Sequence, residues 1–330
     1  MLDEKQVRSP HHTATGFRNN YPSGWKRGSF WQWQRERWER GVPQPPPGGW
    51  RFPSEKPDVA RLRDNRTATT LTWLGHATFL LQVGGLNVLT DPHLSARASP
   101  FQTIGPRRWM PPPLAMNELP HIDLVLLSHN HYDHLDAPTV ARLARQPRGA
   151  PRFLVPLRLA RWFTSRGIRT VDQLDWWETL THGEARLTFT PVQHWSARTT
   201  WDRDRTLWGG WRLDHPASSF FFAGDTGYSA DFADIHARLG PVDLAALPIG
   251  AYEPRWFMQV MHVNPEEAVQ IHLDLHARAS VAMHWGTFVL TDEPLDEPPH
   301  RLRRALTAAD LTERDFWIMR HGETRTLRRS

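Results

Sequence analysis

The chain has no cysteine among its 330 residues. Disulfide bonds, thiolate metal ligands and a cysteine nucleophile are therefore excluded, and any bound metal must be held by His, Asp or Glu. No apolar run approaches the roughly 20 residues that a membrane-spanning helix needs. Residues 1–6 mix charges and lead into no apolar segment of the kind that a signal peptide carries. These absences predict a cytoplasmic protein without a membrane anchor.

Histidine is abundant, with 18 residues beside only 4 tyrosines. Imidazole is a common ligand of zinc-like metals, so the composition by itself makes metal binding worth pursuing. The net charge of +5 and the pI near 10.0 come from arginine. This balance is compatible with nucleic acid, an anionic lipid surface or an anionic substrate as partner, and also with a solvated basic surface.

Residues 1–68 differ from the rest of the chain and are predicted to form an irregular arm packed on a catalytic domain of residues 69–330. The arm is rich in Pro and Arg and contains several tryptophans: Trp25, Trp31, Trp33, Trp38 and Trp50. Only residues 29–40 favour a helix. A stripe of Trp31, Gln34, Arg35 and Trp38 is expected to pack on the main domain, although tryptophan beside arginine also suits a membrane interface.

From residue 69 onward, strand and turn patterns alternate with helices, as in a single α/β domain. Residues 70–83 and 86–90 are predicted to form a hairpin around Gly84-Gly85. A long loop over residues 92–120 is expected to be functional or a lid. Further strands are predicted at residues 122–127, 187–191, 220–223, 244–249 and 280–283. The clearest helix begins at Asn264-Pro265-Glu266-Glu267, because an Asn cap, a Pro at the first position and a Glu at the third are strong start signals.

The run HNHYDH at residues 129–134 follows the apolar strand predicted at 122–127. Two imidazoles separated by one residue point the same way on an extended segment, and a turn can bring the Asp and the next His to a neighbouring point. This spacing predicts a metal site that serves two ions. The ligands in the run are His129, His131, Asp133 and His134.

A zinc ion needs about four donors, so the run requires distant partners. The candidates are His194, Asp225 and His284, each of which follows a predicted strand, where open α/β folds gather site residues. We expect His194 to join His129 and His131 on one metal, and His284 to join Asp133 and His134 on the other. Asp225 would bridge the two metals, and open positions would remain for water.

Other polar residues near these motifs have a less defined role. Asp91 could orient the imidazole of a ligand histidine through its carboxylate, or it could simply form a turn with Pro92. His76 either belongs to the site or packs in a strand. Four further histidines are expected to face solvent: His11, His12, His272 and His276.

Seven blocks of the sequence resemble the metallo-β-lactamase superfamily and, within it, a bacterial member of the N-acylphosphatidylethanolamine-hydrolysing phospholipase D family. They are TWLGHAT (72–78), LTDP (89–92), SHNHYDHLD (128–136), LDWWE (174–178), FAGDTGY (222–228), PIGAYEPRWF (248–257) and HWGTF (284–288). The resemblance extends from about residue 69 to the C-terminus.

This resemblance implies an α/β fold of the αββα four-layer sandwich type, two Zn²⁺ ions, with Mn²⁺ or Fe²⁺ as other candidates, and a homodimer resting on a membrane. It implies hydrolysis of N-acylphosphatidylethanolamine-like phospholipids to an N-acylethanolamine and phosphatidic acid. By position, the ligands are those already named, and Tyr132 and His262 line the reaction site. Met261 departs from the family pattern, in which the animal enzymes have glutamine.

The expected mechanism is attack on phosphorus by a hydroxide that bridges the metals, held by Asp225, while His262 donates a hydrogen bond or proton. Hydrolases of a lactone, another cyclic ester or nucleic acid would keep the same ligands; nucleic acid is not the favoured partner. A redox diiron protein usually has Glu at the position of His131. The non-enzymatic alternative is a membrane-surface protein with a structural metal, and peripheral association with an anionic membrane is compatible with either alternative.

Overall fold

Two seven-stranded β-sheets form the centre of the computed structural model, which describes residues 9–22, 24 and 29–327. The first sheet has the order β14-β1-β2-β3-β4-β5-β6. Its strands are β1 (Thr70–Gly75), β2 (Thr78–Val83), β3 (Leu86–Thr90), β4 (Leu124–Leu126), β5 (Arg152–Pro156), β6 (Val171–Leu174) and β14 (Thr324–Thr326). Strands β3 to β6 are parallel, and β14, β1, β2 and β3 are antiparallel neighbours.

The second sheet has the order β13-β12-β11-β10-β9-β8-β7. Its strands are β7 (Thr179–His182), β8 (Ala185–Thr190), β9 (Gly210–His215), β10 (Ser218–Phe222), β11 (Val242–Pro248), β12 (Ala277–Met283) and β13 (Phe316–Trp317). Strands β10 to β13 are parallel, whereas β7 to β10 form an antiparallel ladder. Each sheet thus combines a parallel half with an antiparallel half.

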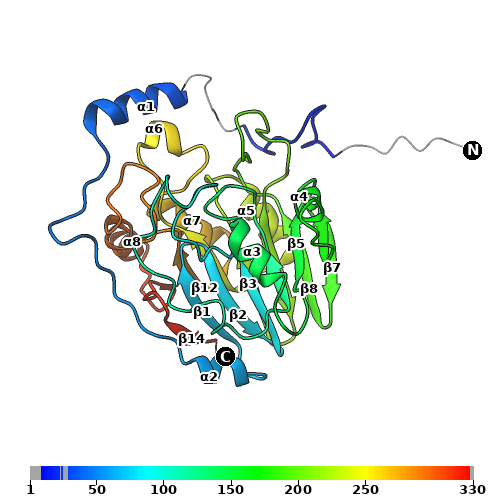
Figure 1. Ribbon diagram of the computed structural model, residues 1–330. Helices are drawn as coiled ribbons and strands as arrows, with labels where there is room; N and C mark the ends of the chain where they lie inside the picture. The colour runs from blue at the N-terminus through cyan, green and yellow to red at the C-terminus, as the bar shows by residue number, and fades with distance from the viewer. Residues whose placement is uncertain (1–8, 23, 25–28, 328–330) are drawn as a thin grey trace, which may run out of the picture.

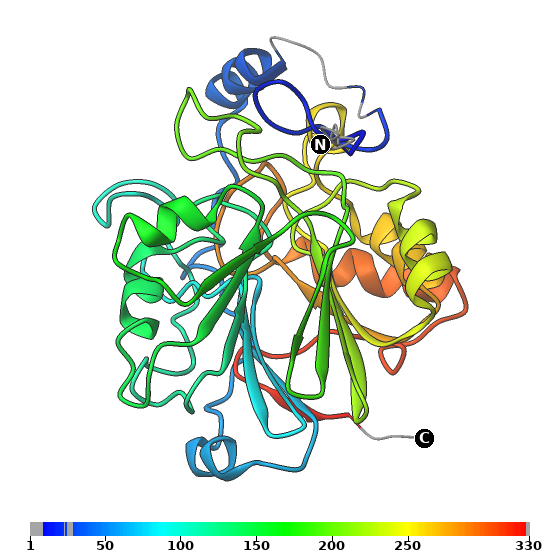
Figure 2. The same cartoon turned by 90° about the vertical axis from the view of Figure 1, so that its right-hand side faces the viewer.

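Helices cover the outer faces of both sheets, which gives the expected αββα sandwich (Figures 1 and 2). One side carries α3 (Ala137–Leu143) and α4 (Ala160–Thr164). The other side carries α5 (Asp231–Leu239), α7 (Pro265–Asp274) and α8 (Glu297–Ala308). The remaining helices are α1 (Ser29–Arg40), α2 (Val59–Asp64) and α6 (Arg255–Met258). None of the helices in the described ranges combines the length and apolarity needed to cross a membrane.

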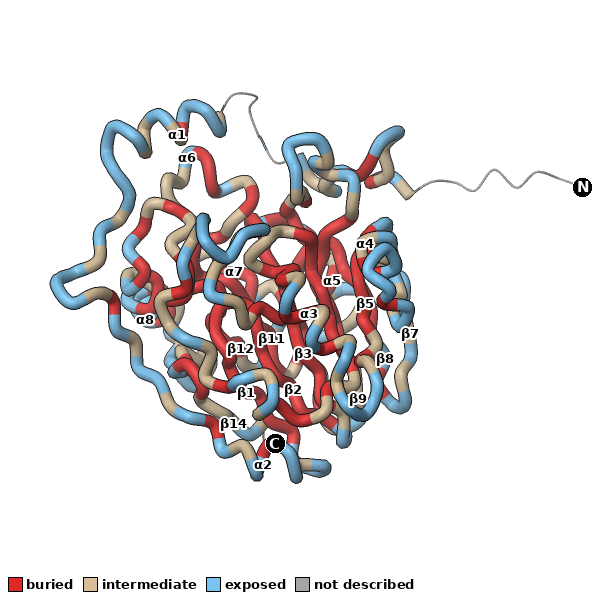
Figure 3. Tube along the Cα trace, viewed as in Figure 1, coloured by how far each residue is buried: buried red, intermediate tan, exposed pale blue. Residues whose placement is uncertain are grey.

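Both faces of the first sheet are covered, and every residue of its central strands β1, β2 and β4 is buried, including the polar side chains of Thr72 and Gln82. In β2, Phe79 and Leu81 belong to the core between the sheets, while Leu80 belongs to the layer under α3 and α4. The strands therefore form the buried centre of the molecule (Figure 3). This arrangement fixes the strand ends from which the polar loops emerge.

Most of the predicted elements are present. The strands expected at residues 86–90, 122–127, 187–191, 220–223, 244–249 and 280–283 correspond to β3, β4, β8, β10, β11 and β12. The helix α7 begins with the expected capping box, in which Asn264 accepts from the backbone of Glu267 and Glu267 accepts from the backbone of Asn264. Residues 70–83 are two strands, because the chain turns at His76, whose φ is +53°. Between β3 and β4, residues 92–120 contain no helix or strand.

Helix α1 is present as predicted, but the prediction of which face packs on the main domain was wrong. Trp31 and Trp38 are 75% and 86% exposed. The buried residue is Trp33, which stacks on Phe257 of α6 with ring centroids 5.2 Å apart and donates its indole N–H to Asp292. Residues 1–6 and Trp25, named above, lie outside the described residues. The division of the chain at residue 68 stays a prediction.

Candidate metal centre

The polar run 129–134 leaves the end of β4 and lies against the loop after β10. Gly224 has φ +62°, and a Cβ there would lie 2.4 Å from the Ser128 Cβ, so only glycine lets the two loops approach this closely. This contact brings Asp225, from the second sheet, beside the histidines of the first. The site is therefore built where the strand ends of both sheets meet.

One group of converging ring nitrogens consists of His129, His131 and His194. The Nε2 of His129 lies 2.8 Å from the Nδ1 of His131, which lies 3.3 Å from the Nε2 of His194. Burial lowers the pKa of all three rings, to about 3 for His131 and His194. These rings are thus neutral at physiological pH, which is the form that binds metals.

The second group consists of Asp133, His134 and His284, with His76 beside them. The Oδ2 of Asp133 lies 3.2 Å from the Nε2 of His134 and 3.3 Å from the Nε2 of His284. The Nε2 of His76 is 2.9 Å from the same oxygen. His76, whose role the sequence left open, thus contacts the site through Asp133.

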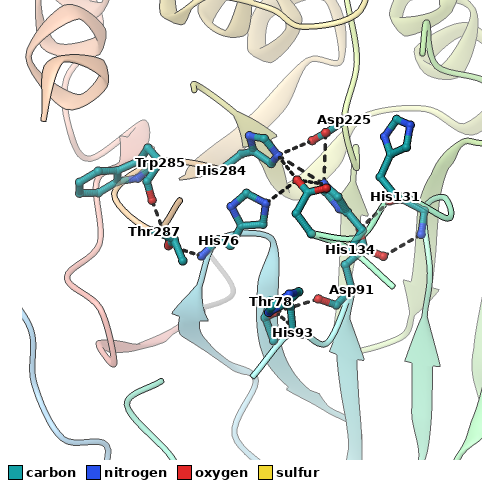
Figure 4. Close-up of polar contacts among 12 residues, drawn as sticks. His76, Thr78, Asp91, His93, His131, His134, Asp225, His284, Trp285 and Thr287 are labelled. Atoms are coloured by element: carbon teal, nitrogen blue, oxygen red, sulfur yellow. Dashed lines mark hydrogen bonds and ion pairs between the residues drawn. The ribbon is translucent and has the colours of Figure 1, made fainter. Parts of the chain in front are cut away.

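Asp225 lies between the two groups. Its oxygens lie 3.1 Å from the Nε2 of His134 and 3.1 Å from the Nε2 of His284, and Figure 4 shows these side chains pointing toward one another. Its Oδ2 is also 4.0 Å from the Nε2 of His129 and 3.9 Å from that of His194. The structure therefore brings together all seven residues that the sequence singled out as ligands, with Asp225 placed to face both groups.

Hydrogen bonds behind the rings fix which nitrogen faces the centre. The Nδ1 of His194 donates to the carbonyl of Met261 at 2.8 Å, so its Nε2 carries a lone pair. Asp91 accepts from the hydroxyl of Ser128 at 2.5 Å, and that oxygen in turn accepts from the Nδ1 of His129 at 2.8 Å. Lone pairs of neutral rings that converge at these distances repel unless a cation lies between them.

Three carboxylates, of which Asp91 and Asp225 are buried and Asp133 is half-buried, add negative charge to the same place. Asp91, Asp133 and Asp225 are ion-paired only to histidine within the described ranges. Burial would lower the pKa of His134, but Asp225, Asp133 and Asp91 raise it well above its ordinary value. Uncompensated charge in a dry site is costly, so the donor set fits divalent cations.

Tyr132 and His262, predicted to line the reaction site, occupy different positions. The ring of His262 precedes α7, and its Nδ1 lies 3.9 Å from the Oδ2 of Asp225. The hydroxyl of Tyr132 donates to the carbonyl of Arg198 at 3.0 Å, so this group is already engaged. His262 thus borders the candidate metal ligands directly, whereas Tyr132 contacts a neighbouring loop.

Arg198 is a supporting residue that the sequence did not single out. Its guanidinium donates to the carbonyls of Asn130 and Leu135, at 2.8 and 2.9 Å, and stacks 3.9 Å from the ring of Tyr132. One side chain therefore ties both ends of the ligand run. An arginine in the loop between β8 and β9 carries no local signal for this role, because its partners lie on another loop.

Two of the histidines expected to face solvent are buried. His11 is 5% exposed and, with half-buried His12, contacts Asp175. His272 is also 5% exposed and contacts the hydroxyl of Ser280. His276 is exposed as expected. The expectation failed where a polar side chain satisfies the ring: Asp175, far along the chain, for His11, and Ser280, on the neighbouring strand β12, for His272.

Comparison with known proteins gives a match to the model of the beta-lactamase superfamily domain over residues 86–285. The chain is 42% identical over 265 residues to N-acyl-phosphatidylethanolamine-hydrolyzing phospholipase D 1 of Caenorhabditis elegans, covering 76% of this chain and 74% of that protein. It is 39% identical to the mitochondrial N-acyl-phosphatidylethanolamine-hydrolyzing phospholipase D of Saccharomyces cerevisiae, covering 70% of this chain and 50% of the yeast protein.

A solved structure, a metallo hydrolase from Ignicoccus hospitalis, has a similar fold. It superposes with a TM-score of 0.60 at 21% sequence identity, covering 80% of this chain and all (100%) of that one. At this identity the likeness concerns the fold.

Proposed function

Because the chain belongs to the metallo-β-lactamase superfamily and, within it, to the N-acylphosphatidylethanolamine-hydrolysing phospholipase D family, we propose that it hydrolyses N-acylphosphatidylethanolamine-like phospholipids. It is a metal-dependent hydrolase of this fold. The products of the proposed reaction are an N-acylethanolamine and phosphatidic acid. The similarity to the worm and yeast enzymes supports the choice of a phosphodiester.

The proposed cofactor is a pair of zinc ions. His129, His131 and His194 would hold one ion, Asp133, His134 and His284 the other, and Asp225 both. The observation that carries this assignment is the position of Asp225, whose oxygens lie 3.1 Å from His134 and His284 and about 4 Å from His129 and His194. Neutral imidazole and carboxylate are ligands that zinc prefers, although manganese and iron also accept them.

A bound metal pair lowers the pKa of water and stabilises negative charge on phosphoryl oxygens. The chain's own residues supply position. Asp91 and the carbonyl of Met261 hold the rings of His134 and His194 so that their lone pairs face inward. His262, at the edge of the centre, is placed to donate a hydrogen bond to a phosphoryl oxygen as charge develops there.

Burial keeps the pKa of His262 at about 3, so the free ring is neutral. A neutral ring can donate through one nitrogen only. The Nδ1 faces the Oδ2 of Asp225 at 3.9 Å, beyond hydrogen-bond distance, so a proton on it remains available to a substrate oxygen. Tyr132 would contribute by packing, because its hydroxyl is engaged by Arg198.

Access of a lipid to this centre is proposed to pass α1 and α6. Trp33 of α1 packs in one apolar cluster with Phe257, Met258 and Met261, and Met261 is adjacent to His262. On the other side of α1, Trp31 and Trp38 are exposed, and the helix runs along the surface of the molecule (Figure 3). Tryptophan and arginine on one helix suit the interface of an anionic membrane. A homodimer is part of the same proposal.

The decisive experiment uses metal-loaded protein and vesicles that contain N-acylphosphatidylethanolamine, in water enriched in ¹⁸O. Attack of water on phosphorus places the label in phosphatidic acid and none in the N-acylethanolamine. Parallel incubations with a lactone, a cyclic phosphodiester and RNA test the rival hydrolases. Asp133→Asn is the matched inactive control. Turnover of a rival substrate without labelled phosphatidic acid would refute the proposal.

A further inference from the structure

A second cluster of metal-ligating side chains lies outside the candidate metal centre. The Nε2 of His11 lies 2.7 Å from the Oδ1 of Asp175, and the Nε2 of His12 lies 2.7 Å from the Oδ2. The ligand atoms of all three lie within 4.8 Å of one another. We infer that His11, His12 and Asp175 form an additional metal site, which takes one zinc-like divalent cation and fixes the N-terminal segment to the sheet sandwich.

The backbone holds the two histidines in place before any ion binds. His12 pairs with Phe17 as an isolated bridge, and the amide of Arg18 donates to the carbonyl of His11 at 2.9 Å, which makes residues 11–18 a small hairpin. Gly16 sits in its turn, where a Cβ would lie 2.0 Å from the carbonyl oxygen of Asp204. The hairpin is therefore pressed against the loop that carries Asp204.

Both rings are also held by aromatic neighbours. The ring of His11 lies 4.3 Å from that of Trp176, and the ring of His12 lies 5.2 Å from that of Phe17. The two imidazoles stand nearly perpendicular, at 87°. They approach one carboxylate from different sides. Ligands whose orientation is already fixed lose little entropy on binding an ion.

The charge of the cluster suits a cation. Asp175 is ion-paired with His11 and His12 and, within the described ranges, with no Lys or Arg. Two imidazoles and a carboxylate are three of the four donors that zinc takes, and half-buried His12 leaves room for water as the fourth.

The site connects to the metal centre through the same segment. Asn19 donates to the carbonyl of His194 at 3.0 Å and accepts from its amide at 3.1 Å. Asn20 and Tyr21 then bind Asp231 and Asp234 of α5. An ion at His11 and His12 therefore fixes the start of a segment that holds the backbone of a proposed zinc ligand. This inference does not depend on which substrate the enzyme hydrolyses.

The test compares the full-length wild-type protein with His12→Asn and Asp175→Asn. Asn at position 12 can still donate a hydrogen bond to Asp175 but is a poor zinc ligand. After saturation with Zn²⁺ and desalting, the wild type should retain about one zinc ion more per chain than either variant, by elemental analysis. The control is His300→Asn, which changes an exposed histidine on α8 and should match the wild type.

Limited proteolysis gives a second readout, which follows zinc binding at His11 and His12 and is independent of zinc bound at the candidate metal centre. Trypsin cleavage after exposed Arg18 should slow about tenfold in wild type when Zn²⁺ exceeds its Kd tenfold, and should not change in His12→Asn. Equal zinc content in wild type and both variants, with equal cleavage rates, would overturn the inference. Asp133→Asn, which alters the central site alone, should keep the zinc-dependent protection, so failure of the two sites can be told apart.

Discussion

Asp91 holds the Nδ1 proton of His134, with the carboxylate Oδ2 and the ring nitrogen 2.6 Å apart and both side chains wholly buried. The same carboxylate accepts the hydroxyl proton of Ser128, which leaves the Ser128 oxygen free to accept from His129. One buried carboxylate therefore sets the tautomers of a proposed ligand in each metal group.

Replacing Asp91 with Asn should weaken metal binding by about 10- to 100-fold. Both oxygens of Asp91 accept hydrogen bonds, whereas Asn would turn one of them into an NH2 donor that faces another donor and would remove the charge that favours the protonated Nδ1 of His134. Competition with a coloured chelator measures this affinity. Asp64→Asn, an exposed residue at the end of α2, is the control and should bind metal like the wild type. Unchanged affinity in Asp91→Asn would remove this carboxylate from the site.

Replacing His262 with Ala should preserve metal content and lower kcat by about 100-fold or more, since a positioned proton or hydrogen-bond donor contributes at least that much. The expectation follows from the 3.9 Å separation between its Nδ1 and Asp225, at the edge of the centre. Elemental analysis and phosphodiester turnover are measured on the same sample. Loss of a metal ion in this variant would instead make His262 a ligand.

Replacing Arg198 with Lys should cost about 1–3 kcal/mol of unfolding free energy, because the ammonium group cannot donate to both carbonyls of the ligand run. Urea denaturation of the metal-free protein measures the loss. Arg161→Lys, on the exposed face of α4, should be neutral. Equal midpoints for the two variants would show that the run holds its shape without Arg198.

Removing metal from the wild type should destabilise the fold, because within the described ranges Asp91, Asp133 and Asp225 then have only histidines as ion-pair partners. At a metal concentration 1,000 times its Kd, binding contributes about 4 kcal/mol per site. Denaturation curves with metal and with chelator give the difference. This difference in unfolding free energy should be smaller in Asp133→Asn. An unchanged difference in that variant would mean that the stabilising ion does not bind at Asp133.

Replacing both Trp31 and Trp38 with Ser should weaken binding to anionic vesicles and reduce turnover of vesicle-borne substrate, while turnover of a short-chain soluble analogue stays near wild type. These rings are 75% and 86% exposed, so little packing is lost. Cosedimentation with vesicles measures binding. Leu273→Ser removes an exposed apolar side chain from α7 and serves as control. Wild-type vesicle binding by the double variant would exclude α1 as the docking element.

The convergence of the candidate ligands could be anticipated because each of them follows a strand, and the ends of strands converge in this fold. The burial of α1 could not, because Trp31, Trp33 and Trp38 have the same chemistry and only the position of α6 decides which one is buried. His11 and His12 were misjudged for a similar reason. Their partner, Asp175, lies more than 160 residues further along the chain.

The strand β14 was also missed, since Thr324–Thr326 carries no apolar pattern and is recognised only by its pairing with β1. Arg198 escaped notice because backbone carbonyls, its partners, are present at every residue. The sequence thus does not reveal contacts between segments that carry no local pattern of their own. What it does reveal are local signals: ligand spacing, buried runs and the cap of α7.

The pairing of β1 with β14 joins Thr70 to Thr326, so the first sheet closes with a strand made some 250 residues after its partner. During synthesis, one edge of β1 therefore stays unpaired until residue 326 has left the ribosome. His284 is likewise made long after His129. A nascent chain therefore cannot assemble the proposed two-metal site until most of the chain has emerged. Contacts between residues so far apart in the sequence are slow to form. The exposed edge of β1 is where a chaperone would be most needed.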